Sequence, residues 1–423
     1  MPRIRIREID NTGATQADSL ISTGVFLPLP DEKVGDKPAD KPVQLVFSKD
    51  GLSVVVAGDE SKVIVDDINN TKGGDTFIVN ALKYGAKLYT ASASVAYESA
   101  PRPSEAPRPS EKEGATPKIT SPKITYAGDY LKDRNQFDIK FFLATEEDLY
   151  GALKIVLKRK DAAVVLSLSE NSYDENISKG LTLPLDYALI GDNRDRFFDE
   201  ESVPFAGKYV IPMYGEGLTG LAAAESYVLA YLYSMYRGNA SWLAVAGSKR
   251  GFIPSNFADS VGLISEDELD TMQPVDPGTH AIAINPICKM NPWGVRIWGN
   301  RTALSVPKKG LVASSFANMR VLICDIKKAM YRAAREYQFE QNNDILWVNF
   351  KSRINTLLDQ MVQGYGIAGY RWTKEDSGSQ YKLCAKLQIV PIEAVEDFDL
   401  TISLSNDLET SVDEVPVPPV PEE

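Results

Sequence analysis

The spacing of apolar and polar residues along the chain changes period several times, and these changes divide it into segments. Arginine and isoleucine alternate at the start, which predicts a strand over residues 2–9 with one charged face. Residues 11–23 are polar and contain glycine, so they predict an extended connector. We therefore expect an N-terminal arm over residues 1–24.

Two parts with mixed periods follow the arm. In residues 25–97 we predict a β-rich α/β part, with strands over 43–47, 52–56, 62–66 and 86–96 and a helix over 75–84. In residues 124–302 we predict strands over 137–143, 162–168 and 209–212 and helices over 146–158 and 221–235. Strands that alternate with helices are typical of an α/β layer with a largely parallel sheet.

Helical periodicity dominates residues 303–405, for which we expect an α+β domain. The first helix, over residues 314–338, has an apolar stripe of Met319, Leu322, Ile323, Ile326, Met330, Ala333 and Tyr337. The second begins near Trp347, is capped by Asn343 or Asp344, and ends in a left-handed turn at Gly364. Its expected buried positions are Ile345, Leu346, Ile354, Leu357, Leu358 and Met361. Strands over 381–390 and 398–404 follow, and we expect the acidic, proline-rich tail over 406–423 to be disordered.

Residues 98–123 contain short proline-rich repeats. The sequence Ala-Pro-Arg-Pro-Ser-Glu occurs twice in succession over residues 100–111, and Pro-Lys-Ile-Thr occurs twice over residues 117–125. Proline at this density excludes a helix or an inner strand, so we predict an exposed linker or insertion. A docking peptide for a proline-binding module is the second interpretation.

Composition restricts the partners. The chain has 423 residues, of which 43% are apolar and 25% charged, enough for several buried cores. Its net charge is −12, but ten acidic and no basic residues lie between Pro391 and Glu423, so the remainder carries only −2. A nucleic-acid-binding protein would need a basic footprint, so we expect no nucleic-acid partner, and the acidic end predicts a charge-selected partner.

The longest apolar run, residues 227–236, is too short to cross a bilayer, and the first residues do not have the pattern of a signal peptide.

The residues that catalysis needs are scarce. His280 is the only histidine, so a Ser-His-Asp or Cys-His arrangement would depend on it. Residues 247–251 have the glycines of a phosphate loop but lack the Walker spacing, and the acidic clusters at 146–148 and 192–195 fit no calcium-binding loop. The chain contains three scattered cysteines, Cys288, Cys324 and Cys384. Their spacing fits no metal site or disulfide pattern, and we expect reduced, mostly buried thiols. We therefore expect no enzyme, no cofactor and no metal.

Six short motifs follow one another in the C-terminal half. Their order is Asn285-Pro286-Ile287, Trp298-Gly299, Arg301-Thr302, an arginine-bearing helix, Phe339 with Asn342, and Trp347, ahead of Gly364. In this order and spacing they resemble the C-terminal part of the tail sheath proteins of contractile-tailed bacteriophages and related injection machines. The resemblance is strongest over residues 285–369 and extends back to residue 86. The proline-rich repeat departs from it, and residues 221–251 match only loosely.

The resemblance implies a multidomain fold and a mechanical function. The implied fold is an α/β middle domain of subtilisin-like topology without protease activity, an α+β sheath domain with two long helices, and extended terminal arms. The implied function is a structural subunit that polymerises as stacked hexameric rings around a tail tube and contracts from a metastable extended state. Implied partners are further copies of the chain, the tail tube protein, and baseplate and tail terminator proteins. The implied location is the virion tail, after assembly in the host cytoplasm.

The two terminal strands have complementary charge. The resemblance implies that they exchange between subunits, where an extended arm adds a strand to the open edge of another sheet. The expected linking residues are Arg3, Ile4, Arg5, Ile6, Arg7 and Ile9 at one end, and Phe398, Asp399, Leu400, Ile402 and Leu404 at the other. The alternative is that both strands pair within their own subunit.

The first C-terminal helix has a basic edge. Its cations are Arg320, Lys327, Lys328, Arg332 and Arg335. The resemblance implies that this edge faces the tail tube, and that reversing the charge of the last three leaves folding intact. A solvated helix face is the alternative.

Two other classes of function remain open. One is a different tail or baseplate component, or the sheath of a phage-derived injection system. The other is a degenerate α/β hydrolase, which the single histidine disfavours.

Overall fold

Ten strands join into one mixed sheet in the computed structural model of the chain, which describes residues 22–34, 41–98, 126–170, 205–254, 261–273, 282–304, 310–375, 381–392 and 394. The order across the sheet is β10-β9-β8-β7-β6-β1-β5-β2-β3-β4. Neighbouring strands are parallel from β9 to β5, and antiparallel at the two ends. The strands are β1 (Gly24–Leu29), β2 (Val43–Phe47), β3 (Val54–Val56), β4 (Asp59–Val65), β5 (Lys87–Ser92), β6 (Phe141–Ala144), β7 (Ala163–Ser167), β8 (Val210–Tyr214), β9 (Asn285–Met290) and β10 (Gly294–Ile297).

The central parallel strands are apolar on both faces. Every residue of β1, β6, β7 and β8 is buried. Along β1, Val25 and Leu27 belong to the core on one face, and Phe26 to the core on the other. A sheet that is covered on both faces requires continuous apolar strands of this kind.

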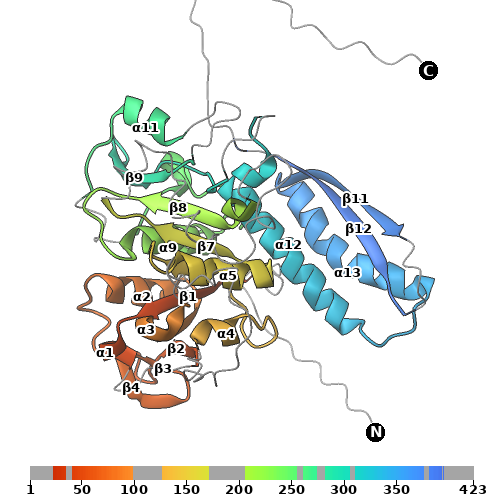
Figure 1. Ribbon diagram of the computed structural model, residues 1–423, viewed down its shortest axis with the longest axis horizontal. Helices are drawn as coiled ribbons and strands as arrows, with labels where there is room; N and C mark the ends of the chain where they lie inside the picture. Colours follow the sequence, from red (N-terminus) through yellow and green to blue (C-terminus); the bar gives the residue numbers. More distant parts are fainter. Residues whose placement is uncertain are drawn as a thin grey trace, which may run out of the picture. The chain divides into compact units, whose positions relative to one another are not determined.

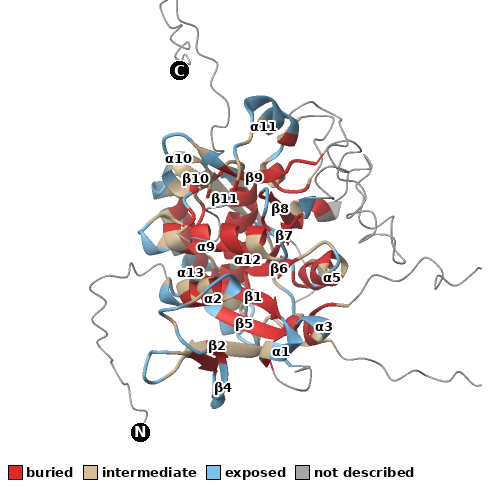
Figure 2. Ribbon diagram, turned by 90° about the vertical axis from the view of Figure 1, so that its left-hand side faces the viewer, coloured by how far each residue is buried: buried red, intermediate tan, exposed pale blue. Residues whose placement is uncertain are grey.

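Helices cover both faces of the sheet (Figure 1). Helices α2 (Gly74–Lys83) and α9 (Ala222–Tyr236) pack on the face of Val25, and α3 (Ala93–Ala96), α4 (Ala127–Leu131) and α5 (Leu149–Arg159) pack on the face of Phe26. The buried residues accordingly concentrate in the strands and in the helices next to them (Figure 2). The remaining short elements are α1 (Asp31–Val34), α10 (Gly247–Arg250), α11 (Glu266–Met272) and the 3-10 turns η2 (Phe205–Tyr209) and η4 (Ala313–Ser315).

The C-terminal helices have their own core. Helices α12 (Ala317–Glu336) and α13 (Asp344–Gln363) pack on each other, and α13 packs on a separate two-stranded antiparallel sheet of β11 (Ile367–Glu375) and β12 (Cys384–Pro391). Figure 1 shows α13 beside β11 and β12. Trp242, from the segment after α9, inserts into this core between the helices.

Most predicted elements are present with their predicted type, and the largely parallel sheet is confirmed. Four strands were missed: β1, β9, β10 and β11. Strands from the predicted parts 25–97 and 124–302 lie in the same sheet, because β1 pairs with both β5 and β6. The division into parts by residue number stays a prediction.

Two details of α13 were predicted wrongly. Ile345 is 70% exposed, since only one side of α13 meets the core. Gly364 has a φ of −89°, and Tyr365, with a φ of 56°, takes the left-handed position instead. Asn343 is confirmed as the N-cap, because its side chain accepts a hydrogen bond from the Leu346 amide at 2.9 Å.

Several predictions fall outside the described residues. They concern both terminal linking strands, the proline-rich repeat, His280 and the acidic tail. Where the chain is described, Cys288 and Cys324 are buried, Cys384 is half-buried, and all three are unpaired. Among the same residues, no helix is both long enough and apolar enough to cross a bilayer.

Candidate assembly surfaces

The motif residues around Asn285 and Thr302 form hydrogen bonds between separate elements of the fold. The amide nitrogen of Asn285 donates to the carbonyls of Pro212 and Arg301 at 2.8 Å each, and its oxygen accepts from the Arg301 amide at 2.7 Å. One buried side chain thus ties β8, β9 and the loop after β10 together. Thr302 donates to the Ser314 carbonyl at 2.9 Å, which attaches the same loop to the start of α12.

Glycines in the motifs permit close approach. A Cβ atom at Gly299 would lie 2.8 Å from the Asn285 side-chain oxygen. At Gly364 it would lie 2.6 Å from the Trp242 ring, whose indole nitrogen donates to the Gly364 carbonyl at 3.2 Å. Through Trp242 and Gly364, the segment after α9 therefore packs directly against the end of α13.

The aromatic motif residues divide into two groups. Trp347 packs in the C-terminal core, with its ring centroid 5.8 Å from that of Trp372. Trp298 is half-buried and stacks on Trp293 at 6.3 Å. Phe339 is 97% exposed and has a positive φ of 76°, and Asn342 is also exposed, so both belong to the outward-facing turn between α12 and α13.

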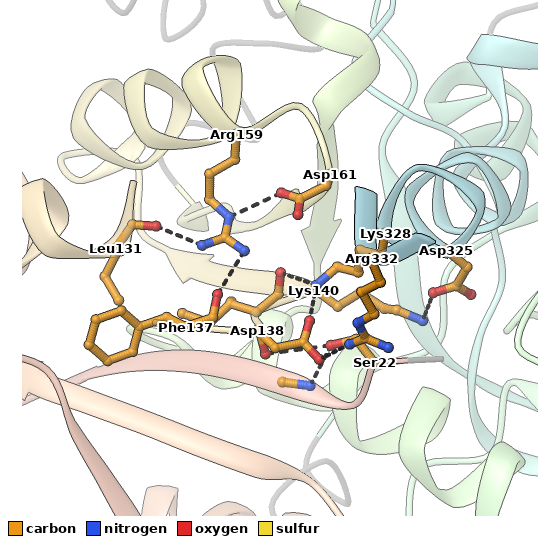
Figure 3. Close-up of polar contacts among 12 residues, drawn as sticks. Ser22, Leu131, Phe137, Asp138, Lys140, Arg159, Asp161, Asp325, Lys328 and Arg332 are labelled. Carbon is orange, nitrogen blue, oxygen red and sulfur yellow. Dashed lines mark hydrogen bonds and ion pairs between the residues drawn. The ribbon is translucent and has the colours of Figure 1, made fainter. Parts of the chain in front are cut away.

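The basic edge of α12 is largely turned into the fold (Figure 3). Lys328 is 3% exposed; its ammonium lies 2.6 Å from the Asp138 carboxylate and donates to the Ile139 carbonyl at 2.8 Å. Arg332 pairs with the other oxygen of the same carboxylate. Burial alone would raise the pKa of Asp138, but Lys328 and then Arg332 lower it to about 2.

Reversing Lys328 would therefore place a carboxylate beside Asp138 in a buried site. The prediction that reversal of Lys328, Arg332 and Arg335 leaves folding intact is wrong for Lys328, because an unpaired buried charge is strongly destabilising. Arg320 is likewise buried, with its guanidinium 4.5 Å from the ring centre of Tyr209. Lys327 is half-buried and Arg335 is exposed.

A second buried ion pair joins α12 to the sheet. The Lys140 ammonium, just before β6, lies 2.5 Å from the Asp325 carboxylate, and both side chains are buried. Lys140 also donates to the Tyr231 hydroxyl at 2.8 Å, and Ser241 donates to Asp325 at 2.9 Å. Burial would lower the pKa of Lys140, but the carboxylate outweighs it and raises that pKa. The pair is invisible in sequence, since its partners are far apart in the chain.

A polar cavity of about 520 Å³ opens where α12 meets the sheet. Its cations are Lys87, Arg134, Lys328, Arg332 and Arg335, and its carboxylates are Asp138 and Asp161. Asp161 is already paired with Arg159, at 3.1 Å. Sequence reasoning found the α12 cations but missed Lys87 and Arg134, because nothing in the local pattern connects them to α12.

Both edges of the sheet of β11 and β12 are unpaired within the described residues. Within the described residues it has two strands only, and neither pairs with the ten-stranded sheet. Its outward residues include the exposed Val390. An unpaired strand edge presents free N–H and C=O groups, which makes it a template for an added strand.

Comparison with known proteins supports one fold. No family model and no curated protein matches the chain. A solved structure of the PVC sheath complex, an extracellular contractile injection system in its contracted state, is 14% identical, with a TM-score of 0.54 over 97% of this chain and 98% of that chain. A chain of the anti-feeding prophage baseplate is 13% identical, with a TM-score of 0.53 over 96% of this chain and 99% of that chain. From its first described strand to its C-terminal hairpin, this chain therefore has the fold of a contractile sheath subunit.

Proposed function

We propose that this protein is the structural subunit of a contractile sheath. Its copies polymerise as stacked hexameric rings around a tail tube and contract from a metastable extended state, which drives the tube through a cell envelope. The observation that carries this proposal is the match in fold to the PVC sheath complex over nearly the full length of both chains. The protein acts mechanically and not as an enzyme.

Strand exchange provides the link between copies. The basic strand over residues 2–9 and the acidic strand over residues 398–404 are the proposed donors, and the open sheet of β11 and β12 is the proposed acceptor. A head-to-tail contact of this kind does not close on itself and so builds a filament. The subtilisin-like topology of the middle domain belongs to the same proposal.

The sheath contacts the tube through charge. Of the basic residues on α12, Arg335 is exposed and Arg332 and Lys327 are half-buried, so these three are the proposed tube-facing residues. The cavity adds Lys87 and Arg134 to the same surface. Five cations and two carboxylates line the cavity, so it carries a net positive charge that would attract an acidic element of the tube.

Electron microscopy of the purified protein tests the proposal. Negative staining is expected to show long hollow cylinders. Short rings would instead support a baseplate component, which the match to the anti-feeding prophage baseplate favours as the second candidate. Plain monomers under all conditions would contradict both.

A proline in the N-terminal arm tests strand exchange. Ile6→Pro removes a backbone donor from the linking strand, so it is expected to abolish long cylinders and leave a folded, soluble subunit. Deletion of residues 1–20 is expected to do the same. The matched control is Ala14→Pro in the connector, which should assemble normally. Normal cylinders from Ile6→Pro would show that the arm does not link copies.

A further inference from the structure

Four aromatic rings that are far apart in the sequence form a continuous strip. The ring centre of Tyr84, just after α2, lies 5.4 Å from that of Tyr233 and 5.2 Å from that of Tyr236, both near the end of α9. Phe252 lies 5.5 Å from Tyr233, and the guanidinium of Arg296 on β10 lies 4.9 Å from the Phe252 ring centre. We call these five residues the aromatic strip. Helices α2 and α9 pack on the same face of the sheet, and β10 is the end strand of that sheet (Figure 2).

The aromatic strip is open to solvent. Tyr236 is 65% exposed and Phe252 is 38% exposed, and both Tyr84 and Tyr233 are half-buried. The Nε of Arg296 is buried and has no hydrogen-bond partner among the described groups. Contiguous exposed rings beside an arginine have the composition of a binding surface, because aromatic residues and arginine are enriched at interfaces.

Proline-rich segments bind surfaces of this kind. A polyproline II helix is already extended and has no internal hydrogen bonds, so its rings pack on aromatic side chains at little entropic cost. The tail contains such a tract over residues 415–421, Val-Pro-Val-Pro-Pro-Val-Pro. The aromatic strip offers three successive ring-to-ring contacts of 5.2–5.5 Å on which the prolines of this tract can pack.

Charge favours this tract over the other proline-rich segment of the chain. Arg296 lies at the Phe252 end of the strip, and the exposed Lys83 and Arg237 adjoin Tyr84 and Tyr236 in the sequence. Acidic pairs flank the tail tract on both sides, at 413–414 and 422–423. Each copy of the repeat over residues 100–111 instead carries one arginine and one glutamate, so the repeat has no net charge.

We propose that the aromatic strip binds residues 415–421 of a second copy of this chain as a polyproline II segment. The inference rests on the proposed function, because a tail that crosses to a neighbour has a role only in an assembly. It gives the last part of the chain a second anchor, beyond the exchanged strand at 398–404. The binding step itself does not require assembly, so it is testable on separate subunits.

Fluorescence anisotropy with a labelled peptide of residues 405–423 measures this binding. The receptor is the full-length chain whose own tail prolines are replaced by alanine, at Pro416, Pro418, Pro419 and Pro421, so that its tail does not compete. Saturable binding is expected. The additional pair Tyr236→Ala and Phe252→Ala is expected to weaken it at least about tenfold, or about 1.4 kcal/mol. Unchanged affinity in that variant overturns the proposal.

Two controls distinguish binding at the aromatic strip from non-specific apolar contact and from purely electrostatic contact. Leu263→Ala removes an equally exposed apolar side chain that is not part of the strip, and it should leave the affinity unchanged. A peptide with the same four prolines replaced by alanine keeps every acidic residue and should bind at least about tenfold more weakly. Equal binding by that peptide would show a purely electrostatic contact and would contradict the proposal.

Cross-linking identifies which copy supplies the tail. A photoreactive residue at position 417 in full-length chains, assembled as a mixture of light and heavy isotopes, is expected to join light tails to heavy strips. Cross-links confined to single copies would overturn the assignment to a second copy. If the protein forms no cylinders, the proposed function fails, and the anisotropy result still decides whether the aromatic strip binds the tract.

Discussion

Glu225 is a carboxyl group without a strong cationic partner in the interior. It lies in the first turn of α9 and is almost fully buried. Burial raises its pKa to about 7; nearby Asp75 adds to the shift and Lys33 opposes it. The folded state therefore holds a proton at Glu225 that the unfolded state releases above its ordinary pKa of 4.5.

This difference makes the stability of the protein depend on pH. Because the folded pKa is raised, the contribution of Glu225 is fully present below pH 4.5 and is lost as the pH rises through 7. Glu225→Gln keeps the neutral form at every pH. We expect it to match the wild type near pH 4.5 and to exceed it at pH 8 by about 2–3 kcal/mol, measured by urea unfolding. Exposed Glu147→Gln is the control, and an equal pH profile in both variants would contradict the burial effect.

Helix α12 connects two cores through charged residues. One end of it contributes Ala317 and Val321 to the core under the sheet, and the rest contributes to the C-terminal core. Between these, Asp325 pairs with Lys140 and Lys328 pairs with Asp138, two residues that lie just before β6. Several cations of the basic stripe seen in the sequence therefore hold α12 against the rest of the fold. Because these ion pairs join α12 to the sheet, we expect the subunit to move as one body during the proposed contraction, while the terminal arms change conformation.

Breaking the buried pair measures the strength of this docking. Asp325→Ala leaves Lys140 buried without its partner and is expected to cost about 3–5 kcal/mol of unfolding free energy. The double change Asp325→Leu with Lys140→Met removes both charges and should recover most of that loss. The control is Arg353→Ala, which breaks an exposed pair with Glu336 and should cost at most about 1 kcal/mol. Urea unfolding distinguishes these cases, and a double variant as unstable as Asp325→Ala would contradict the account.

In the whole molecule, charges from separate elements converge on one surface. The cavity at the junction of α12 and the sheet gathers Arg134 and Arg335, which are 201 positions apart in the sequence. Neither has a carboxylate partner within hydrogen-bond range among the described side chains. Their charge is thus available to a partner.

Reversing these two charges tests the contact with the tube. Arg134→Glu with Arg335→Glu is expected to abolish assembly around tubes at physiological salt and to leave folding intact, because the Arg335 side chain is exposed. Wild-type assembly should weaken as salt is added, since exposed charges are screened. Lys49→Glu is the control, because Lys49 does not line the cavity and its ammonium pairs with Glu60. Co-sedimentation with purified tubes measures the effect, and normal co-sedimentation of the double variant would remove the assignment.

The sequence by itself determined the elements and the family resemblance. Apolar periods are local, so they located the parallel strands β5, β6, β7 and β8 and the helices α12 and α13. The residue types ahead of α13 offered Asn343 or Asp344 as its cap, and the ordered motifs near Trp298 and Trp347 suggested the sheath fold. The tertiary structure alone decided which charges are available. Lys328 and Arg335 lie on the same helix with the same chemistry, yet only the placement of Asp138 distinguishes the buried one from the exposed one. Burial depends on what packs opposite a residue, and the residues that pack on α12 come from segments nearly two hundred positions away.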